Sequence, residues 1–296
     1  MPETQHTATL QTLLAAYPNT CALRQGELRS SLVNFAFADV KIANKAFKAL
    51  VREQKFDLGE LAIVTFLQAK VHGKPYVLMP AVVVARGQHH TILYNPERGH
   101  LNPGDLNGRK VGVRAYTQTT GAWVRGFLHE DYGVDFRSVK WITFEDPHVA
   151  EYTDPPWVHP APEGKQLVQM LLDGEIDAAI FGSENPEGTP FKPLIPDAAE
   201  VAARWAEKHG GVPINHMMVI KESITRTRPD VAREVYSMLK KSAAAGPLKS
   251  PGVPRFGVEA VRKSLETIIQ YSERQGLIPR RLSVDELFND VTRAFD

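Results

Sequence analysis

The sequence predicts a two-lobed α/β protein that binds a ligand in a cleft between its lobes. At 296 residues, the chain exceeds one ordinary hydrophobic core and suits one large or two medium α/β domains. Apolar runs of strand length alternate with segments of helical spacing, a pattern typical of a mostly parallel sheet covered by helices on both faces. A stretch dense in Gly, Pro and Asn, residues 95–108, separates two such series and marks a crossing between the lobes.

Five segments before this crossing build the predicted first lobe. Apolar residues recur at helical spacing behind Asp39, which suits an N-cap, and Gly73 ends a second, shorter helix. In chain order, the segments are a strand over Thr9–Tyr17, a helix over Val40–Val51, a strand over Phe56–Ile63, a helix over Thr65–His72 and a buried strand over Tyr76–Ala85.

The second lobe is predicted from a similar alternation after the crossing. Its segments are a strand over Lys110–Arg114, a helix from about Thr119, a strand over Val139–Phe144, a helix over Gly164–Leu172 and a strand over Ile176–Phe181. Between them, Glu145–Gly164 carries five prolines and no clear period, which predicts a long ordered loop at the lip of a site.

The chain then returns to the first lobe. The returning segments are a strand over His216–Ile220 and helices over Asp230–Ala245, Val258–Gln275 and Val284–Phe295, the last with a capping box of Ser283 and Glu286. We therefore assign residues 1–95 and 213–296 to the first lobe and 96–212 to an inserted second lobe. The two crossings between them form a hinge. The C-terminal helices either cover the first lobe or form the surface of a homodimer.

Composition excludes several classes of function. Lys and Arg number 35 against 34 Asp and Glu, a balance that argues against nucleic acid, because a polyanion needs a strongly basic face. The single Cys21 forms no internal disulfide, and no Cys/His cluster has zinc spacing. Phosphate-binding loops, GxSxG and HExxH are absent, so we expect no metal and no cofactor.

Location is predicted from the N-terminus and from hydropathy. The first residues lack the basic start, apolar run and cleavage site of a secretion signal, and no run approaches the roughly 20 apolar residues of a membrane span. We therefore expect a cytoplasmic protein with no membrane span, or a periplasmic one if a leader was removed.

The segment VGVRAYTQTTGAWVRG carries the first candidate site. A strand ends at Arg114, and a helix begins within the polar run, so hydroxyls and free backbone amides point together and suit an anion. The polar run consists of Thr117, Gln118, Thr119 and Thr120. An equally weighted alternative is that one threonine simply caps the helix. Arg125, further along, is predicted to be a structural or surface arginine.

Further candidates follow other strands. Arg86, in ARGQHHTILYN, offers a fork for a carboxylate, and His89 and His90 exchange protons near neutral pH. In an extended chain, the two histidines point to opposite sides, so one of them faces the cleft. The remaining candidates are His216 at the return crossing, Glu60 and Tyr17 at strand ends, and Thr65, which suits a helix cap. For His216, a purely structural role has the better prior.

Several stretches resemble one family in their order and spacing. They are YPNTCAL, KFDLGELA, GVRAYTQTTGAWVRG, YGV, LLDGEIDAAIFG and GVPINHMMVI, from about Tyr17 to Ile220. These stretches are similar to those of 4,5-dihydroxyphthalate decarboxylase-like proteins, a branch of the type 2 periplasmic-binding-protein fold. The resemblance implies a metal-independent cytoplasmic lyase that acts on an aromatic dicarboxylate.

Three functions remain open on this evidence. The first is decarboxylation of a hydroxylated aromatic acid, in which His89, His90 or His216 protonates the ring while Arg86, Arg114 and the Thr117–Thr120 amides hold a carboxylate. Glu60 is a further catalytic candidate. The alternative is a solute-binding protein for a small organic anion, which needs no titrating group over the ligand. The third is a different reaction on the same scaffold.

Overall fold

The computed structural model describes residues 6–182, 185–246 and 256–296, which form two compact units. Unit 1 comprises Met1–Arg86, Ile214–Glu266 and Leu282–Asp296, and unit 2 comprises Gly87–Pro213 and Thr267–Arg281. The chain leaves unit 1 at Arg86, whereas the sequence placed the crossing after residue 95. The sequence also left all C-terminal residues in the first lobe.

The assignment of Thr267–Arg281 to unit 2 has a physical cause in its side chains. The Tyr271 hydroxyl donates to Glu130 Oε2 at 2.5 Å, and the Gln275 side chain donates to the Ala122 carbonyl at 2.8 Å. Both acceptors lie in helix α4, Thr119–Tyr132, which is part of unit 2. An amphipathic sequence pattern shows that this segment packs on something, but it does not identify the partner.

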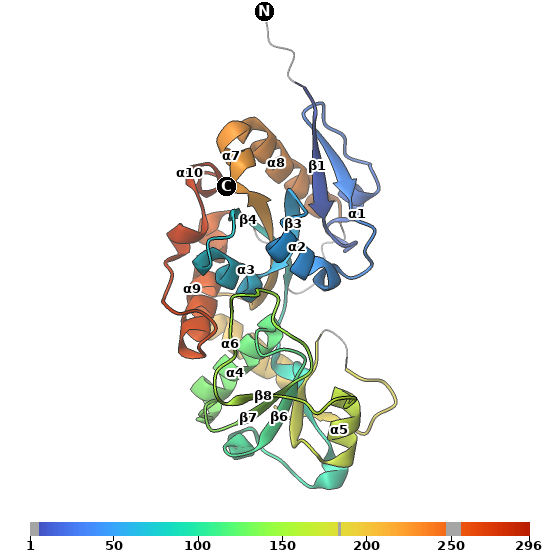
Figure 1. Cartoon of the computed structure of the whole chain (residues 1–296), viewed down its shortest axis with the longest axis vertical. Coiled ribbons are helices and arrows are strands. Elements are labelled where there is room, and N and C mark those ends of the chain that lie inside the picture. Colours follow the sequence, from blue (N-terminus) through green and yellow to red (C-terminus); the bar gives the residue numbers. More distant parts are fainter. Residues whose placement is uncertain (1–5, 183–184, 247–255) are drawn as a thin grey trace, which may run out of the picture. The chain divides into compact units, whose positions relative to one another are not determined.

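Unit 1 is built on a five-stranded sheet of order β2-β1-β3-β11-β4 (Figure 1). Its strands are β1 Ala8–Leu13, β2 Val33–Phe37, β3 Leu58–Ala62, β4 Tyr76–Ala85 and β11 Ile214–Lys221. Strand β1 runs parallel to β2 and β3, while β11 is antiparallel to both β3 and β4. The strands β1, β3 and β4 therefore run in one direction, and their carboxyl ends share one edge with the start of β11.

Helices cover this sheet, and a buried apolar core lies beneath α8. The helices of unit 1 are α1 Cys21–Arg24, α2 Phe47–Glu53, α3 Ile63–Val71, α7 Glu222–Thr227, α8 Pro229–Ala245 and α10 Asp290–Arg293, together with the first part of α9 Val258–Arg274. Helix α8 contacts β2 and β4. The core between this helix and the sheet includes Leu58, Met79 and Met218 from the strands and Val235 and Leu239 from α8. Burial of these apolar side chains is the main stabilising term of the unit.

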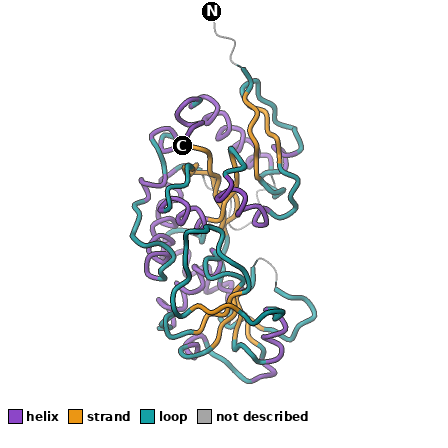
Figure 2. The backbone as a smooth tube through the Cα atoms, in the orientation of Figure 1, coloured by secondary structure: helices purple, strands orange, loops and turns teal. Residues whose placement is uncertain are grey.

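Unit 2 has a six-stranded sheet of order β10-β5-β9-β6-β7-β8. Its strands are β5 Ile92–Tyr94, β6 Lys110–Val113, β7 Lys140–Thr143, β8 Val158–Pro160, β9 Ala178–Ile180 and β10 Lys192–Pro193. Its helices are α4, α5 Leu167–Asp173 and α6 Ala198–His209. The four strands β9, β6, β7 and β8 are parallel, and β5 and β10 add two antiparallel partners. Within this unit, as in unit 1, helices flank the strands (Figure 2).

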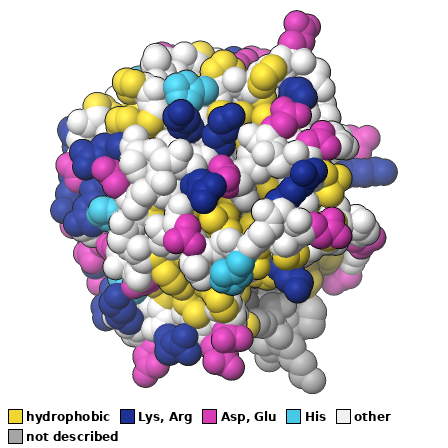
Figure 3. All heavy atoms as spheres, turned by 90° about the horizontal axis from the view of Figure 1, so that it is seen from below, with side chains coloured by type: hydrophobic (Ala, Val, Ile, Leu, Met, Phe, Trp, Pro, Cys, Tyr) yellow, Lys and Arg dark blue, Asp and Glu magenta, His cyan; other side chains and the backbone are white. Residues whose placement is uncertain are grey.

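Short 3-10 helices complete the described structure. They are η1 Ala43–Ala46, η2 His89–Thr91, η3 Pro96–Arg98, η4 Pro103–Leu106 and η5 Val284–Leu287. Ser283 caps η5 and, with Glu286, makes the predicted capping box. Over the described ranges, no helix has the length and apolar character needed to cross a bilayer. On the face drawn in Figure 3, acidic and basic side chains are interspersed.

Several predicted elements differ from those observed. The helix predicted over Val40–Val51 begins only at η1 and α2, and Ile42 rather than Asp39 precedes it. The helix predicted over Val284–Phe295 is split into η5 and α10, because Phe288 and Asn289 adopt extended backbone between them. Strand β2, helix α6 and the short β8 inside the predicted loop went unpredicted.

Candidate functional site

Polar side chains collect at the carboxyl edge of the unit 1 sheet. Tyr17 follows β1, Glu60 lies within β3, Arg86 follows β4, and His216 lies near the start of β11. Strand pairing sets Met218 opposite Glu60 and His216 opposite Ala62, so Glu60 and His216 share one face of the sheet. Ligands of open α/β sheets bind at this edge. We refer to Tyr17, Glu60 and His216 as the Glu60 cluster.

The carboxyl group of Glu60 is buried in this face with little to compensate an ionised charge. Its side chain is 0% exposed, and Oε2 has no hydrogen-bond partner among the described residues. Oε1 accepts a hydrogen bond of 3.0 Å from the Tyr17 hydroxyl. Burial raises the pKa of Glu60 to about 8, against the lowering effects of Tyr17, the Ala15 amide and the charge of Arg24. Glu60 therefore carries its proton at neutral pH.

Tyr17 is held in place by a tight turn. Its backbone N–H donates to Thr20 Oγ1 at 2.8 Å, and that hydroxyl donates to the Ala15 carbonyl at 2.8 Å. The turn at Pro18 and Asn19 is therefore closed by Thr20, which fixes where the Tyr17 ring enters the sheet edge. Burial, with Glu60 nearby, raises the pKa of Tyr17, so the phenol stays a hydrogen-bond donor.

His216 is partly exposed, as is Tyr17. Its Nδ1 lies 3.8 Å from Glu60 Oε1, and its ring meets Phe47 edge-on at 5.3 Å between centroids. The side chain is 21% exposed, whereas Glu60 is closed off. A distance of 3.8 Å is too long for a hydrogen bond but close enough for proton exchange after a small movement or through one water.

Arg86 is half-buried at the end of β4, and burial lowers its pKa from the usual guanidinium range.

Thr65 does not occupy the helix-cap position for which it was predicted. It is 1% exposed inside α3, whose N-cap position belongs to Ala62 and not to Thr65. A contact of Thr65 with a ligand stays a prediction.

The candidates in unit 2 surround the start of α4. Arg114 donates to Glu145 Oε2 at 2.7 Å, so the predicted anion-binding arginine is already neutralised by a carboxylate. Gln118 occupies the N-cap position without a side-chain capping bond, and no threonine caps the helix. The buried Gln118 Oε1 has no partner among the described residues. Thr117, Thr119 and Thr120 are all buried.

The two adjacent histidines lie in η2, where a 3-10 turn replaces the extended chain that was expected. His89 is 0% exposed and stacks on Phe127 with 4.0 Å between ring centroids. Burial lowers the pKa of His89 to about 4. The ring is therefore a neutral, buried group at neutral pH, and a catalytic role for His89 stays a prediction. His90 is half-buried in the same turn.

Two arginines with structural roles flank these sites. Arg24 of α1 donates to the Leu14 carbonyl and lies over the Phe37 ring at 5.0 Å, and no motif had pointed to it. Arg125 is fully buried, so of the two predicted alternatives the structural one applies and the surface one does not. It donates to Gln275 Oε1 at 2.7 Å and lies 3.9 Å above the Tyr116 ring. Within the described ranges, no three His, Cys, Asp or Glu side chains gather as a metal site.

Solved structures show that the chain has the fold of periplasmic solute-binding proteins. The alkanesulfonate-binding protein SsuA from Xanthomonas axonopodis pv. citri, bound to MOPS, superposes with a TM-score of 0.60 at 13% identity, over 96% of this chain and 99% of its own. The desulfurization enzyme DSZB superposes with a TM-score of 0.55 at 13% identity, over 96% and 97% of the two chains. These similarities confirm the predicted two-lobed fold class.

Sequence comparison shows similarity to two decarboxylases. A 4,5-dihydroxyphthalate decarboxylase from Comamonas testosteroni is 32% identical over 191 residues, 60% of this chain and 58% of its own. One from Pseudomonas putida is 33% identical over 138 residues, 44% of this chain and 53% of its own. The chain thus spans little more than half the length of these relatives in the matched part. No protein-family model matches it. The resemblance to 4,5-dihydroxyphthalate decarboxylases is confirmed.

Proposed function

We propose that the chain decarboxylates a hydroxylated aromatic carboxylate such as 4,5-dihydroxyphthalate, without a metal ion. The observation that carries the proposal is the Glu60 cluster. A carboxyl group that stays protonated at neutral pH, at a ligand-binding edge, is suited to deliver a proton. Two named decarboxylases support the substrate class through their sequence similarity.

In this mechanism, the ring hydroxyl supplies electron density to the carbon that bears the leaving carboxylate. That carbon takes the proton of Glu60, relayed through one water because the Glu60 carboxyl group is itself buried, so a C–H bond forms and Glu60 becomes a carboxylate. The C–C bond to the carboxylate then breaks, its electron pair returns to the ring, and carbon dioxide leaves. His216, the accessible neighbour, returns a proton from solvent to Glu60. One proton enters and one carbon dioxide leaves, so the ring keeps its oxidation state.

Substrate binding is assigned to groups at the strand ends. Arg86 offers a charge-assisted fork to the carboxylate that stays on the ring, and burial strengthens such a pair. Within unit 2, the backbone amides at the start of α4, with Gln118, stay a prediction for binding an anionic group. Arg114 is a weaker candidate for binding an anion, because its charge is already paired with Glu145.

A solute-binding protein without chemistry is the second candidate. SsuA shares the fold and binds MOPS, which favours this reading, whereas DSZB shows that the fold also serves an enzyme. The two candidates differ at Glu60. A neutral carboxylic acid can donate a hydrogen bond to a bound anion in either case, but only a decarboxylase requires it to give up its proton, so turnover distinguishes the two candidates.

The deciding experiment incubates chelator-treated protein with 4,5-dihydroxyphthalate and follows carbon dioxide release together with thermal shift. We expect release, a loss of at least about 100-fold in kcat for Glu60→Gln, and a smaller loss for His216→Asn. Glu53→Gln, an exposed carboxylate on α2, is the matched control and keeps wild-type turnover. A thermal shift without release indicates a binding protein. Turnover that survives in Glu60→Gln removes Glu60 from the mechanism.

A further inference from the structure

The connection between β1 and β2 leaves part of the unit 1 sheet uncovered. Parallel neighbours need a crossover, which usually carries a helix long enough to cover the sheet between them. Here, the only helix of the crossover is α1, with four residues. Two aromatic side chains of the edge strand β2, Phe35 and Phe37, consequently stay half-exposed although they adjoin the core under α8. A pocket with a volume of about 670 Å³ occupies this place.

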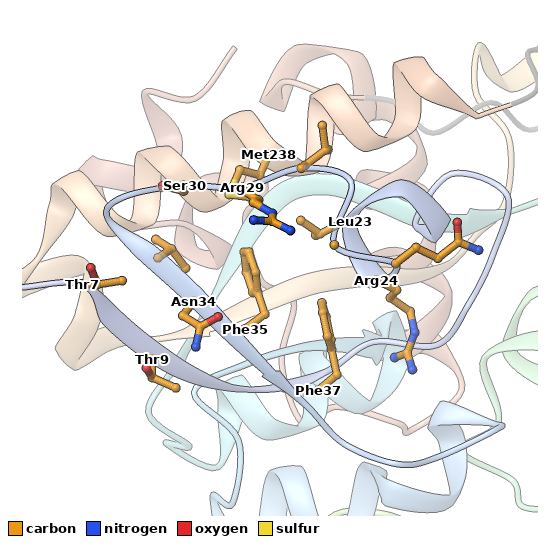
Figure 4. A pocket seen from close by; sticks show the side chains of 14 residues that line it. Thr7, Thr9, Leu23, Arg24, Arg29, Ser30, Asn34, Phe35, Phe37 and Met238 are labelled. Carbon is orange, nitrogen blue, oxygen red and sulfur yellow. The ribbon is translucent and has the colours of Figure 1, made fainter.

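The pocket combines flat aromatic walls with positive charge. Phe35 and Phe37 stack with 5.6 Å between centroids and 14° between ring planes. Figure 4 shows the two rings standing side by side, with Arg29 reaching toward Phe35 and the Arg24 guanidinium beside Phe37. Leu23 and Met238 contribute apolar surface. No aspartate or glutamate lines the pocket among the described residues.

Arg29 is the group available to a ligand. Its side chain is exposed, and the described residues give it no hydrogen bond or ion pair. The Arg24 guanidinium, by contrast, already donates to the Leu14 carbonyl, and its remaining donors and its charge face the Phe37 side of the pocket. Two cations without a lining carboxylate favour an anion, and the neighbouring phenyl rings favour a planar apolar body.

We propose that this pocket of unit 1 is a second ligand site, separate from the Glu60 cluster, that binds a planar aromatic carboxylate. The aromatic body lies against Phe35 and Phe37, and its carboxylate pairs with Arg29. Ligand size agrees with the space, because small-molecule pockets commonly have volumes of a few hundred Å³ or more. The assignment does not depend on the proposed decarboxylation, since Arg29, Phe35 and Phe37 take no part in that reaction.

Naphthalene-2-carboxylate is the probe of choice, since it has no hydroxyl group for the proposed reaction. Isothermal titration calorimetry should give a Kd near or below about 1 mM for the wild-type protein. The Arg29→Gln variant should bind at least about tenfold more weakly, because it loses a charge-assisted contact without losing core packing. Arg233→Gln, an exposed arginine on α8 outside the pocket, is the matched control and should bind like wild type. Arg24 is left intact, because it also holds the peptide next to Ala15, whose amide donates to Glu60.

Two further measurements separate this pocket from other sites. Neutral naphthalene-2-carboxamide should bind much more weakly than the acid, and Arg86→Gln should bind the acid like wild type. Absence of binding at 10 mM probe, a concentration about tenfold above the expected Kd, would overturn the proposal. So would affinity unchanged in Arg29→Gln, or affinity lost in Arg86→Gln, which would place the probe at the carboxyl edge of the sheet.

Discussion

Replacing Glu60 by glutamine should make unit 1 more stable relative to wild type as the pH rises. In the folded protein, burial raises the pKa of Glu60 from 4.5 to about 8. Below pH 4.5, folded and unfolded chains both hold the proton, and the stabilising contribution is complete. Between pH 4.5 and about pH 8, only the folded chain keeps the Glu60 proton. The free energy of unfolding of the wild-type protein therefore falls by about 1.4 kcal/mol per pH unit in this range. The advantage of Glu60→Gln should therefore grow by roughly 4 kcal/mol between pH 5 and pH 8.

Urea unfolding at pH 5, 6, 7 and 8 measures this difference, with two optical probes. All four tryptophans lie between Trp123 and Trp205, in unit 2, so their fluorescence follows that unit alone. Far-UV circular dichroism follows both units, and the transition absent from fluorescence belongs to unit 1. Glu53→Gln is the control and should show no such trend. A stability difference between wild type and Glu60→Gln that stays constant with pH would refute a protonated, buried Glu60.

Two other predictions concern side-chain contacts, one in each unit. Tyr17→Phe removes the hydrogen bond that favours ionised Glu60, so the pKa of Glu60 should rise further. In a urea series continued to pH 9 and 10, the loss of stability should extend to higher pH than in wild type, and an unchanged end point would contradict the contact. Gly126→Ala should destabilise unit 2 by about 1–3 kcal/mol, because a Cβ there overlaps the Tyr271 ring. Tryptophan fluorescence in urea measures the effect, and Gly104→Ala, whose Cβ has its nearest neighbour at 3.6 Å, should be nearly silent.

Sequence patterns predicted the sheet edge that carries the Glu60 cluster but not the cluster itself. The apolar runs around β3, β4 and β11 are long enough to identify as strands, and Tyr76–Ala85 was predicted with the observed bounds. What brings His216 to Glu60 is the antiparallel register of β11 on β3, which sets His216 against Ala62. Pairing between segments so far apart in the chain leaves no local signal.

Local structure explains where the predicted site residues of unit 2 lie. His89 and His90 were read as extended chain, whereas the Thr91 hydroxyl and amide both donate to the Gln88 carbonyl and close a 3-10 turn. That turn carries His89 into the aromatic core around Phe127. The position of Arg114 at the end of a strand was predicted from the sequence. Its ion-pair partner Glu145 follows a different strand, so the sequence alone gave no indication of this pair.

A neutral carboxylic acid suits the proposed chemistry better than the histidines first considered. An imidazolium beside the reacting carbon would attract the carboxylate that must leave and would stabilise the ground state, which raises no rate. Protonated Glu60 donates without that attraction, and its charge appears only after the proton has moved. The new carboxylate then stands in a buried site, where Tyr17 donates to it and Arg24 contributes positive charge from α1. These contacts favour the state formed by proton transfer, and they leave His216, at 3.8 Å, to restore the acid.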